Sequence, residues 1–327
     1  MSLESQPSEQ DAQSVQSCES WNRERTLLDS SPLSALDDHG RPIPVTIPIA
    51  LAPGIKVVYT TRLGGVSSGD YAQLNLGGKG GDDPQAVAAN RQALGRQLDR
   101  TIVLVDQVHS ARVWDADQDQ LLGRCEADAQ VTTRRDLALG IFAADCLPVL
   151  LADSKAGVMG AAHCGRRGLV AGVIPATVRA MVGKGADPSR IMATLGPRIC
   201  AACYQMGSDL ADDFEQRFPG ASGPCRFGGI AIDIAFAARM ELKAAGVTRI
   251  VDSAPRVGAA TSYLRRDPDL RELCDQDHEG PSLSKRLDDL RRPLCTLENP
   301  LWYSHRRASL AGKAGEGRML ALIMVDD

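Results

Sequence analysis

Long apolar runs, a surplus of charge of one sign and a paired cysteine framework are all missing from this 327-residue chain. No apolar run approaches the roughly 20 residues that span a bilayer, so we expect no transmembrane helix and no membrane partner. The N-terminus is polar and acidic, whereas a secretory signal is first basic and then apolar. We therefore expect a soluble, cytoplasmic protein.

The charge balance of the chain does not indicate a surface that binds polyanions. Lys and Arg number 37 against 41 Asp and Glu, which leaves a formal net charge of −4. Nucleic acids are bound through basic patches or stripes, so no nucleic-acid partner is expected. The sequence points to no particular protein partner.

The nine cysteines are scattered from Cys18 to Cys295 without regular spacing, which fits a reducing compartment better than a disulfide scaffold. Cys200 and Cys203 form a C-x-x-C pair, a spacing found in zinc and redox sites. The sequence shows no second pair that would complete a structural zinc site. We therefore assign neither zinc nor redox chemistry to this pair.

Composition divides the chain into a polar start and a globular remainder. Residues 1–42 are rich in Ser, Gln, Glu and Asp and are predicted to be disordered. Residues 43–327 are expected to form a single catalytic domain of the α/β class, with mixed β-sheets flanked by helices.

Local patterns predict the elements of that domain. Apolar and β-branched runs indicate strands, which we place at 55–61, 101–110, 137–142, 157–162, 190–197, 302–307 and 318–325. Helices are predicted at 84–98, 168–185, 208–218 and 233–245, the second with a kink or a new start near Pro175. Asp83 and Pro84 supply an N-cap and a first-turn proline for the first of these helices.

Two of the apolar runs each lead to a side chain that can bind a metal or attack a carbonyl. Cys146 follows the first run and His163 follows the second, seventeen residues later. That separation allows a strand, a turn and a return strand that would bring the two ends together. A small core cysteine and a satisfied core histidine are the alternative interpretation.

A series of ordered motifs resembles the YfiH-like family, whose members have been labelled laccase-domain or polyphenol oxidase proteins and purine nucleoside phosphorylases. The motifs are TTRLGGVSSGDYAQLNLG, DQVHS, AADCLPVLLAD, AAHCGRRGLVAGV, LGPRICAACYQMG and WYSHRR with GEGRMLALI. The resemblance implies a YfiH-like fold related to cytotoxic-necrotising-factor-type deamidases. Between the motifs, an apparent insertion occupies about 254–292.

The resemblance implies a metal site formed by His109, Cys146 and His163. Two imidazoles and one thiolate suit Zn²⁺, and three protein ligands leave a fourth position open, as in catalytic zinc sites. Cu²⁺ is the alternative ion, because copper outcompetes zinc on affinity. A four-copper oxidase needs on the order of ten imidazoles, whereas this chain has five histidines.

The activity implied is the cleavage of adenosine, inosine and S-methyl-5'-thioadenosine by phosphate, together with adenosine deamination. Besides Cys146, Asp145 is the catalytic candidate, as an acid–base residue or as a turn cap. Strand-end and motif positions nominate a set of phosphate- or substrate-binding residues: Arg62, Asn75, Arg167, Arg306 and Arg307.

Two other functions remain open at this stage. A cysteine hydrolase would use Cys146 as nucleophile and His163 as base. The non-enzymatic alternative is a binding or regulatory module, which the resemblance connects with the editing of peptidoglycan precursors. The chain also departs from the family pattern, with Cys164, Arg166, Gln205 and His305 inside otherwise matching motifs.

Overall fold

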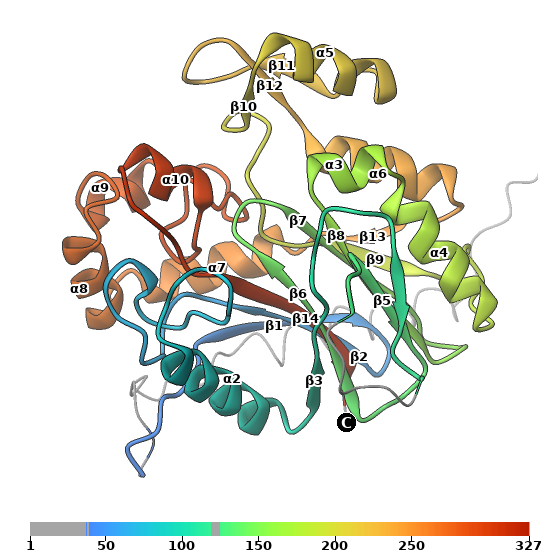
Figure 1. Cartoon of the computed structure of the whole chain (residues 1–327), viewed down its shortest axis with the longest axis horizontal. Helices are drawn as coiled ribbons and strands as arrows, with labels where there is room; N and C mark the ends of the chain where they lie inside the picture. Colours follow the sequence, from blue (N-terminus) through green and yellow to red (C-terminus); the bar gives the residue numbers. More distant parts are fainter. Residues whose placement is uncertain (1–36, 38, 119–124, 327) are drawn as a thin grey trace, which may run out of the picture. The chain divides into compact units, whose positions relative to one another are not determined.

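The computed structural model describes residues 37, 39–118 and 125–326, which form two large mixed β-sheets flanked by helices (Figure 1). The predicted α/β class is thereby confirmed. The first sheet has the strand order β1 (Thr46–Ala52), β2 (Ile55–Thr60), β14 (Met319–Val325), β6 (Leu137–Ala143) and β3 (Thr101–Val103). The second has the order β13 (Arg249–Val251), β9 (Met192–Leu195), β7 (Leu147–Asp153), β8 (Val158–Cys164), β5 (Ala129–Thr132) and β4 (Val113–Asp115).

Helices and a small third sheet complete the described structure. The small sheet has the order β10 (Gln205–Met206), β12 (Ile230–Ile232) and β11 (Ser222–Pro224). The helical elements up to residue 244 are η1 (Gly69–Tyr71), α2 (Pro84–Leu98), α3 (Arg166–Val170), α4 (Val173–Gly183), α5 (Ser208–Arg217) and α6 (Ile234–Ala244). Those that follow are α7 (Ala254–Leu264), α8 (Pro268–Gln276), α9 (Leu283–Asp288) and α10 (His305–Leu310). Among the described residues, no helix combines the length and the apolar character that crossing a membrane requires.

The two large sheets share a core, and each has a second core on its outer face. Alternating side chains of a strand point to opposite faces, so Ile323 of β14 packs between the sheets while Leu322 packs toward α2. In β7, Leu150 lies between the sheets and Val149 packs toward α4 and α6. The layers are therefore helix, sheet, sheet and helix, and strands in both sheets are apolar on two faces.

Most of the predicted elements are confirmed, with two differences. The strand expected at 101–110 ends at Val103, and the residues after it form the loop that carries His109. The strand expected at 302–307 is wrong, because Ser304 caps α10 by accepting a hydrogen bond from Arg307 N at 3.1 Å. The kink or new start near Pro175 corresponds to the break between α3 and α4.

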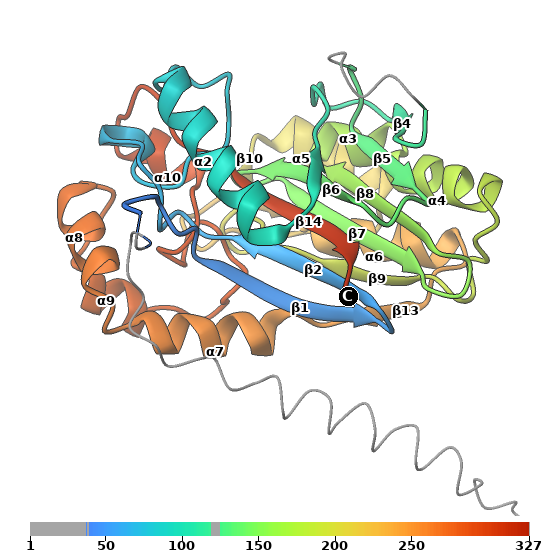
Figure 2. The same cartoon turned by 90° about the horizontal axis from the view of Figure 1, so that it is seen from below.

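The insertion predicted at about 254–292 contains α7, α8 and α9. Figure 2 shows α7 running along β1, and Arg256 Nε donates a hydrogen bond to Pro48 O at 3.4 Å. All of the predicted disordered segment 1–42 except residues 37 and 39–42 lies outside the described residues. Its boundary with a single catalytic domain at 43–327 therefore stays a prediction.

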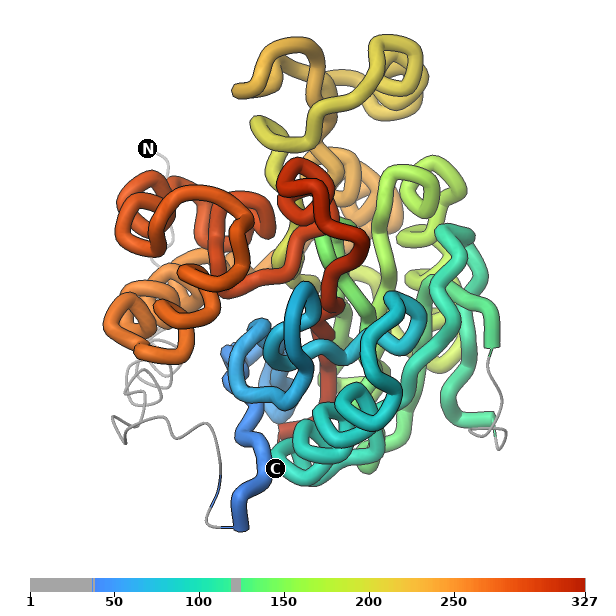
Figure 3. The backbone as a smooth tube through the Cα atoms, turned by 60° about the vertical axis from the view of Figure 1, so that its left-hand side comes forward, coloured from blue at the N-terminus to red at the C-terminus, as the bar shows by residue number. Residues whose placement is uncertain are grey.

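Three segments that are distant in sequence meet around α10. In Figure 3 the chain at α10 (red) passes between the segment near residue 70 (blue) and the segment that leads to β10 (yellow). Tyr303 Oη donates a hydrogen bond to Tyr71 O at 2.6 Å, and Arg306 Nη2 donates one to Gln205 O at 3.0 Å. This junction forms one side of the candidate active site.

Candidate metal centre and active site

Three side chains with metal-binding atoms converge at one end of the second sheet. Cys146 directly precedes β7, and His163 lies near the end of β8. The two strands pair antiparallel with Leu147 opposite Cys164, which brings Cys146 beside His163. His109 enters from the loop after β3, and one ligand atom from each of the three residues lies within 4.8 Å of the others. The structure thus brings together the three residues that the resemblance nominates as metal ligands.

Asp128, which directly precedes β5, holds the imidazole of His163 and the backbone of His109 in place. Its Oδ1 lies 2.8 Å from His163 Nδ1 and accepts a hydrogen bond from His109 N at 2.9 Å. Its Oδ2 accepts hydrogen bonds from Ser110 N at 2.6 Å and from Ser110 Oγ at 2.8 Å. These bonds stabilise the left-handed backbone of His109, whose φ is 62°. Because Asp128 holds Nδ1 of His163, Nε2 is the ring nitrogen left for an ion.

Charges within the site set the protonation states of its members. Burial raises the pKa of Cys146, but the charge of His163 and a hydrogen bond from His109 outweigh burial and lower it to about 6. Burial lowers the pKa of His163, but the Cys146 thiolate and Asp128 outweigh burial and raise it to about 9. Burial also raises the pKa of Asp128, yet its hydrogen bonds from His163 and Ser110 hold it well below its usual range. Near neutral pH, the metal-free site therefore pairs a thiolate with an imidazolium.

The geometry of this donor set suits a tetrahedral zinc ion. Zinc bonds of about 2.0–2.1 Å to nitrogen and 2.3 Å to sulfur put two ligands of one ion roughly 3.3–3.6 Å apart. Cys146 Sγ and His109 Nε2 are 3.7 Å apart. A Cβ atom at Gly165 would lie 2.9 Å from Cys146 Sγ and 3.0 Å from His109 Cδ2, so this close approach requires glycine.

A cavity of about 780 Å³ opens beside the three residues. This volume lies within the range of about 300–1,000 Å³ that small-molecule sites occupy. The cavity is also lined by a glycine-rich loop, the end of β6 and the start of α10, with these residues among others: Gly77, Gly78, Lys79, Gly80, Arg91, Phe142, Asp145, Tyr204, His305, Arg306 and Arg318. The candidate metal centre therefore forms one part of a larger pocket whose lining includes four Lys or Arg residues and three carboxylates.

Asp145 lines this cavity and is fixed by two hydrogen bonds. Its Oδ1 accepts from Thr296 Oγ1 at 2.6 Å, and its Oδ2 accepts from Arg306 N at 2.7 Å. The second bond satisfies a backbone N–H in the first turn of α10, so the carboxylate helps to start that helix. Asp145 thus has the positioning role that the sequence left as an alternative, in addition to its place in the cavity wall.

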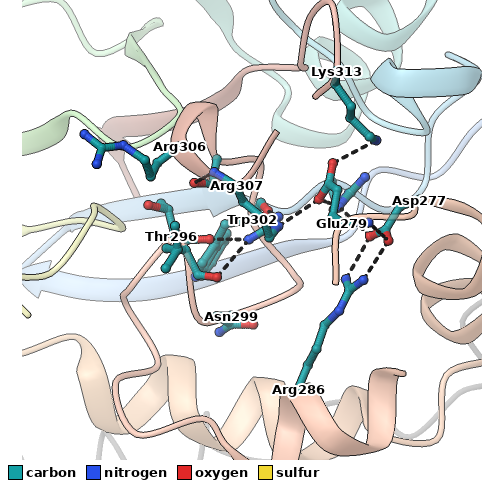
Figure 4. A network of polar contacts seen from close by, with 12 residues as sticks. Asp277, Glu279, Arg286, Thr296, Asn299, Trp302, Arg306, Arg307 and Lys313 are labelled. Atoms are coloured by element: carbon teal, nitrogen blue, oxygen red, sulfur yellow. Dashed lines mark hydrogen bonds and ion pairs between the residues drawn. The ribbon is translucent and has the colours of Figure 1, made fainter. Parts of the chain in front are cut away.

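Of the five predicted phosphate or substrate contacts, Arg306 lines the cavity and the other four do not. Arg62 is fully buried, and its Nη1 lies 3.2 Å from Glu279 Oε2. Arg307 Nε donates to the same Oε2 at 2.7 Å, and Figure 4 shows Glu279 between Arg307 and Lys313. Arg62 and Arg307 therefore lie outside the cavity lining as structural cations whose charges are met by Glu279 in the inserted segment.

Asn75 and Arg167 also lie outside the cavity lining. Asn75 is buried, and its Oδ1 accepts hydrogen bonds from Gly77 N and Arg318 N, both at 2.9 Å. It shapes the glycine-rich loop of the cavity instead of lining the cavity. Arg167 is exposed on α3 and does not belong to the cavity lining.

Sequence reasoning missed several residues of the site. The cavity cations Lys79, Arg91 and Arg318 were not singled out, although the run GGKGG at 77–81 was a visible signal for a close-packed, lysine-bearing loop. Asp128 was missed because a single aspartate before a short apolar run carries no distinctive spacing. Its partner His163 is 35 residues away, so the contact appears only after folding.

The family model described as multi-copper polyphenol oxidoreductase laccase matches residues 56–326. A purine nucleoside phosphorylase of Streptomyces griseus is 46% identical over 199 residues, which cover 58% of this chain and 79% of the relative. A purine nucleoside phosphorylase of Corynebacterium glutamicum is 39% identical over 230 residues, which cover 68% of this chain and 88% of the relative.

Solved structures show the same fold. A DUF152-family protein of Neisseria meningitidis matches with a TM-score of 0.66 and 31% identity, covering 87% of this chain and 99% of its own. The YfiH protein of Bacillus licheniformis also matches with a TM-score of 0.66, at 23% identity, covering 86% of this chain and 97% of its own. The fold class predicted from the sequence motifs, a YfiH-like arrangement of mixed sheets and helices, is confirmed.

Proposed function

Since this chain belongs to the multi-copper polyphenol oxidoreductase laccase family, with relatives named purine nucleoside phosphorylases, we propose that it cleaves purine nucleosides with phosphate at a zinc centre. One observation carries the proposal: the cluster of His109, Cys146 and His163 opens onto a cavity that contains several cationic side chains and is large enough for a nucleoside and a phosphate ion. The proposed substrates are adenosine, inosine and S-methyl-5'-thioadenosine. Adenosine deamination is proposed as a second activity of the same site.

His109, Cys146 and His163 would hold the metal ion. When bound, zinc would supply Lewis-acid stabilisation of developing negative charge and would activate water for deamination. Zinc is proposed over a four-copper arrangement because, among the described residues, only two imidazoles belong to a candidate ligand cluster. A single copper ion would use the same donor set, and metal analysis of the purified protein distinguishes the two ions.

Phosphate would bind to the cationic wall of the cavity. Arginine forms charge-assisted and often bidentate hydrogen bonds with phosphate oxygens. Arg306, Lys79, Arg91 and Arg318 all line the cavity, where Lys79 Nζ lies 3.2 Å from Asp106 Oδ1 and Arg318 pairs with Glu316. Arg62 and Arg307 lie outside the cavity and meet Glu279. The proposed phosphate site therefore uses Arg306 from the original prediction and the three newly recognised cations.

Phosphorolysis forms a bond between a phosphate oxygen and the anomeric carbon and breaks the bond to the purine, which leaves with the electron pair. Phe142 and Tyr204 in the cavity wall provide aromatic faces for a purine. Burial raises the pKa of Tyr204, so its phenol stays protonated as a hydrogen-bond donor to the departing base. Asp145 is proposed as the acid–base residue, since its two hydrogen bonds leave acceptor positions unused.

Replacing Arg306 by alanine is expected to raise the KM for phosphate by about 10- to 100-fold, the cost of losing one or two charged hydrogen bonds. Steady-state kinetics with varied phosphate measures this change. Arg167→Ala is the matched control, and its KM for phosphate should stay within about twofold of wild type because Arg167 does not line the cavity. An equal rise in KM in both variants would identify Arg167 as a phosphate contact. It would also contradict the proposal that phosphate binds at the cavity wall.

Zinc affinity is expected to rise with pH. The ion requires a neutral imidazole at His163 and a thiolate at Cys146. Because the pKa of His163 is raised to about 9, zinc must displace its proton at neutral pH, and below about pH 6 it must also displace the proton of Cys146. The association constant for zinc should therefore rise about tenfold per pH unit between roughly pH 6 and 9, where one proton is displaced. It should rise more steeply below about pH 6, where two protons are displaced. Recovery of phosphorolysis on zinc titration at several pH values measures it, and a flat profile would contradict it.

The proposed function is tested with purified protein of known metal content. Base release from adenosine, inosine and methylthioadenosine is measured with and without phosphate, and ammonia release is followed in parallel. Phosphate-dependent release with formation of the sugar 1-phosphate is the expected result. Release that ignores phosphate would indicate a nucleoside hydrolase, and no release from any of the three would reject the proposal.

A cysteine hydrolase is a second candidate because Asp128, His163 and Cys146 are arranged like a catalytic triad. The lowered pKa of Cys146 suits a nucleophile as well as a metal ligand. The second imidazole favours the metal, since His109 Nε2 lies 3.7 Å from the same sulfur and a triad has no use for it. The metal content and turnover of a Cys146→Ser variant separate the two functions.

A further inference from the structure

We propose a second metal site, formed by Cys200, Cys203, Cys295 and Glu298, which holds a structural zinc ion. One ligand atom from each of the four residues lies within 4.8 Å of the others. Cys203, Cys295 and Glu298 are buried, and Cys200 is partly exposed. This site shares no ligand with the cluster at Cys146, and its role goes beyond nucleoside cleavage.

The spacing of the four residues is that of a zinc site assembled from two turns. Cys200 and Cys203 are separated by two residues, and so are Cys295 and Glu298. Structural zinc sites commonly combine two such C-x-x-C pairs, and carboxylate oxygens are also zinc ligands. The chain has no second C-x-x-C pair, and in this proposal Cys295 and Glu298 take its place. This pair lies more than ninety residues further on and ends in glutamate, so a search for cysteines does not find it.

The backbone already holds the two turns together. Arg198 and Cys295 form a parallel β-bridge. Arg198 N donates a hydrogen bond to Leu294 O at 2.9 Å, and Thr296 N donates one to Arg198 O at 2.9 Å. Cys203 N donates to Cys200 O at 2.9 Å, which closes the first turn. The ligands are therefore positioned before an ion binds, which reduces the entropy lost on binding.

The distances between ligand atoms match those around one tetrahedral ion. Glu298 Oε1 lies 3.8 Å from Cys200 Sγ and 3.6 Å from Cys203 Sγ. Zinc bonds of about 2.0–2.2 Å to oxygen and 2.3 Å to sulfur place such pairs roughly 3.5 Å apart. A redox dithiol needs two sulfurs, whereas here a third thiol and a carboxylate converge on the same point.

The charges around the cluster suit an occupied site. Three thiolates, one carboxylate and one Zn²⁺ carry a formal charge of −2. Arg226 Nη1 lies 3.1 Å and Arg292 Nη1 lies 3.2 Å from Glu298 Oε1, and these two cations balance that charge. The backbone N–H groups of Arg291 and Arg292 donate to Glu298 Oε2 at 3.2 and 3.0 Å. Hydrogen-bonded outer residues of this kind orient metal ligands.

The second site supports the wall of the active-site cavity. Thr296, which follows Cys295, donates to Asp145 Oδ1 at 2.6 Å. Tyr204, which follows Cys203, lines the cavity. An ion at the second site would therefore fix two segments that hold Asp145 and Tyr204, and it would cross-link turns that are distant in the chain.

The test uses protein in which the first site has been removed by Cys146→Ser. Metal analysis of this full-length variant is expected to find about one zinc ion per chain, and adding Cys295→Ala should remove it. Cys274→Ala in the same background is the matched control, because Cys274 is also a buried cysteine and lies outside both clusters. Cobalt substitution of the Cys146→Ser protein should give a thiolate-to-cobalt absorption band with the intensity of three sulfur ligands.

A milder variant guards against loss of folding in the cysteine mutants. Glu298→Gln in the Cys146→Ser background keeps all three thiols and is expected to weaken zinc binding about 10-fold or more while retaining the thiolate band. A Cys146→Ser protein that binds no zinc or cobalt tightly would overturn the proposal. So would a Cys200–Cys203 disulfide in protein purified without oxygen, which would identify a redox pair. Neither result depends on nucleoside turnover, so the proposed function stands or falls separately.

Discussion

Replacing Cys146 by serine is expected to remove one metal equivalent and to lower kcat/KM for phosphorolysis by about 10³-fold or more, the loss of several kcal/mol of charge stabilisation. A serine hydroxyl is a hard, weakly acidic ligand and does not replace a thiolate. Only the imidazoles of His109 and His163 would remain at that site. Metal analysis of the variant beside its steady-state kinetics measures both effects.

Cys125→Ser is the control for this substitution, because Cys125 is another partly exposed cysteine and belongs to neither ligand cluster. It should leave metal content and turnover unchanged. A Cys146→Ser protein with full metal content and no turnover would identify Cys146 as a nucleophile and favour the cysteine hydrolase. Retained turnover would argue against both functions.

Replacing Glu279 by glutamine is expected to lower the free energy of unfolding by about 3–5 kcal/mol, as when one partner of a buried ion pair is removed. The Glu279 side chain is 3% exposed and meets Arg62, Arg307 and Lys313. Burial raises the pKa of Glu279, but the two arginines outweigh burial and hold it well below its usual range. Glutamine would leave Arg62 with Asp277 at 3.5 Å as its remaining carboxylate. Urea denaturation of the variant measures the loss.

Glu272→Gln makes the same chemical change at an exposed position of α8. Its effect should lie within about 0.5 kcal/mol of zero, because Glu272 accepts an exposed hydrogen bond from Gln276 Nε2 at 3.0 Å and glutamine can accept the same bond. Equal stability of Glu279→Gln and wild type would contradict the assignment of Arg62 and Arg307 as structural cations. Those two arginines would then again be available to bind phosphate.

Local sequence patterns predicted the part of the site that depends on neighbouring strands. The interval between Cys146 and His163 allowed one strand, a turn and a return strand, and β7 and β8 are that hairpin. In this hairpin the short turn at 154–157 sets the register, because it pairs Asp153 with Val158 and so fixes every pair that follows. The position of α2 was likewise readable from Asp83 and Pro84, since Asp83 Oδ1 accepts a hydrogen bond from Gln85 N at 2.9 Å.

Those local patterns do not predict contacts between residues that are distant in the sequence. Arg62 ends a strand motif, but its carboxylate partner Glu279 comes from the insertion, 217 residues later. Cys200 and Cys203 have no further candidate metal ligands near them in the sequence, because Cys295 and Glu298 join them only after folding. In each case the sequence supplied a reactive residue type, and tertiary packing decided whether its partner was a ligand, a counter-ion or a neighbouring donor atom.

The proposed metal ion at His109, Cys146 and His163 is the component that would drive phosphorolysis. Its most direct test is zinc reconstitution of chelator-treated protein, with inosine and phosphate as substrates. Base release should be absent from the stripped protein and should return in proportion to the first-site zinc. In the Cys146→Ser variant, zinc at the same concentrations should restore none of it. Full turnover by the stripped protein would contradict the account.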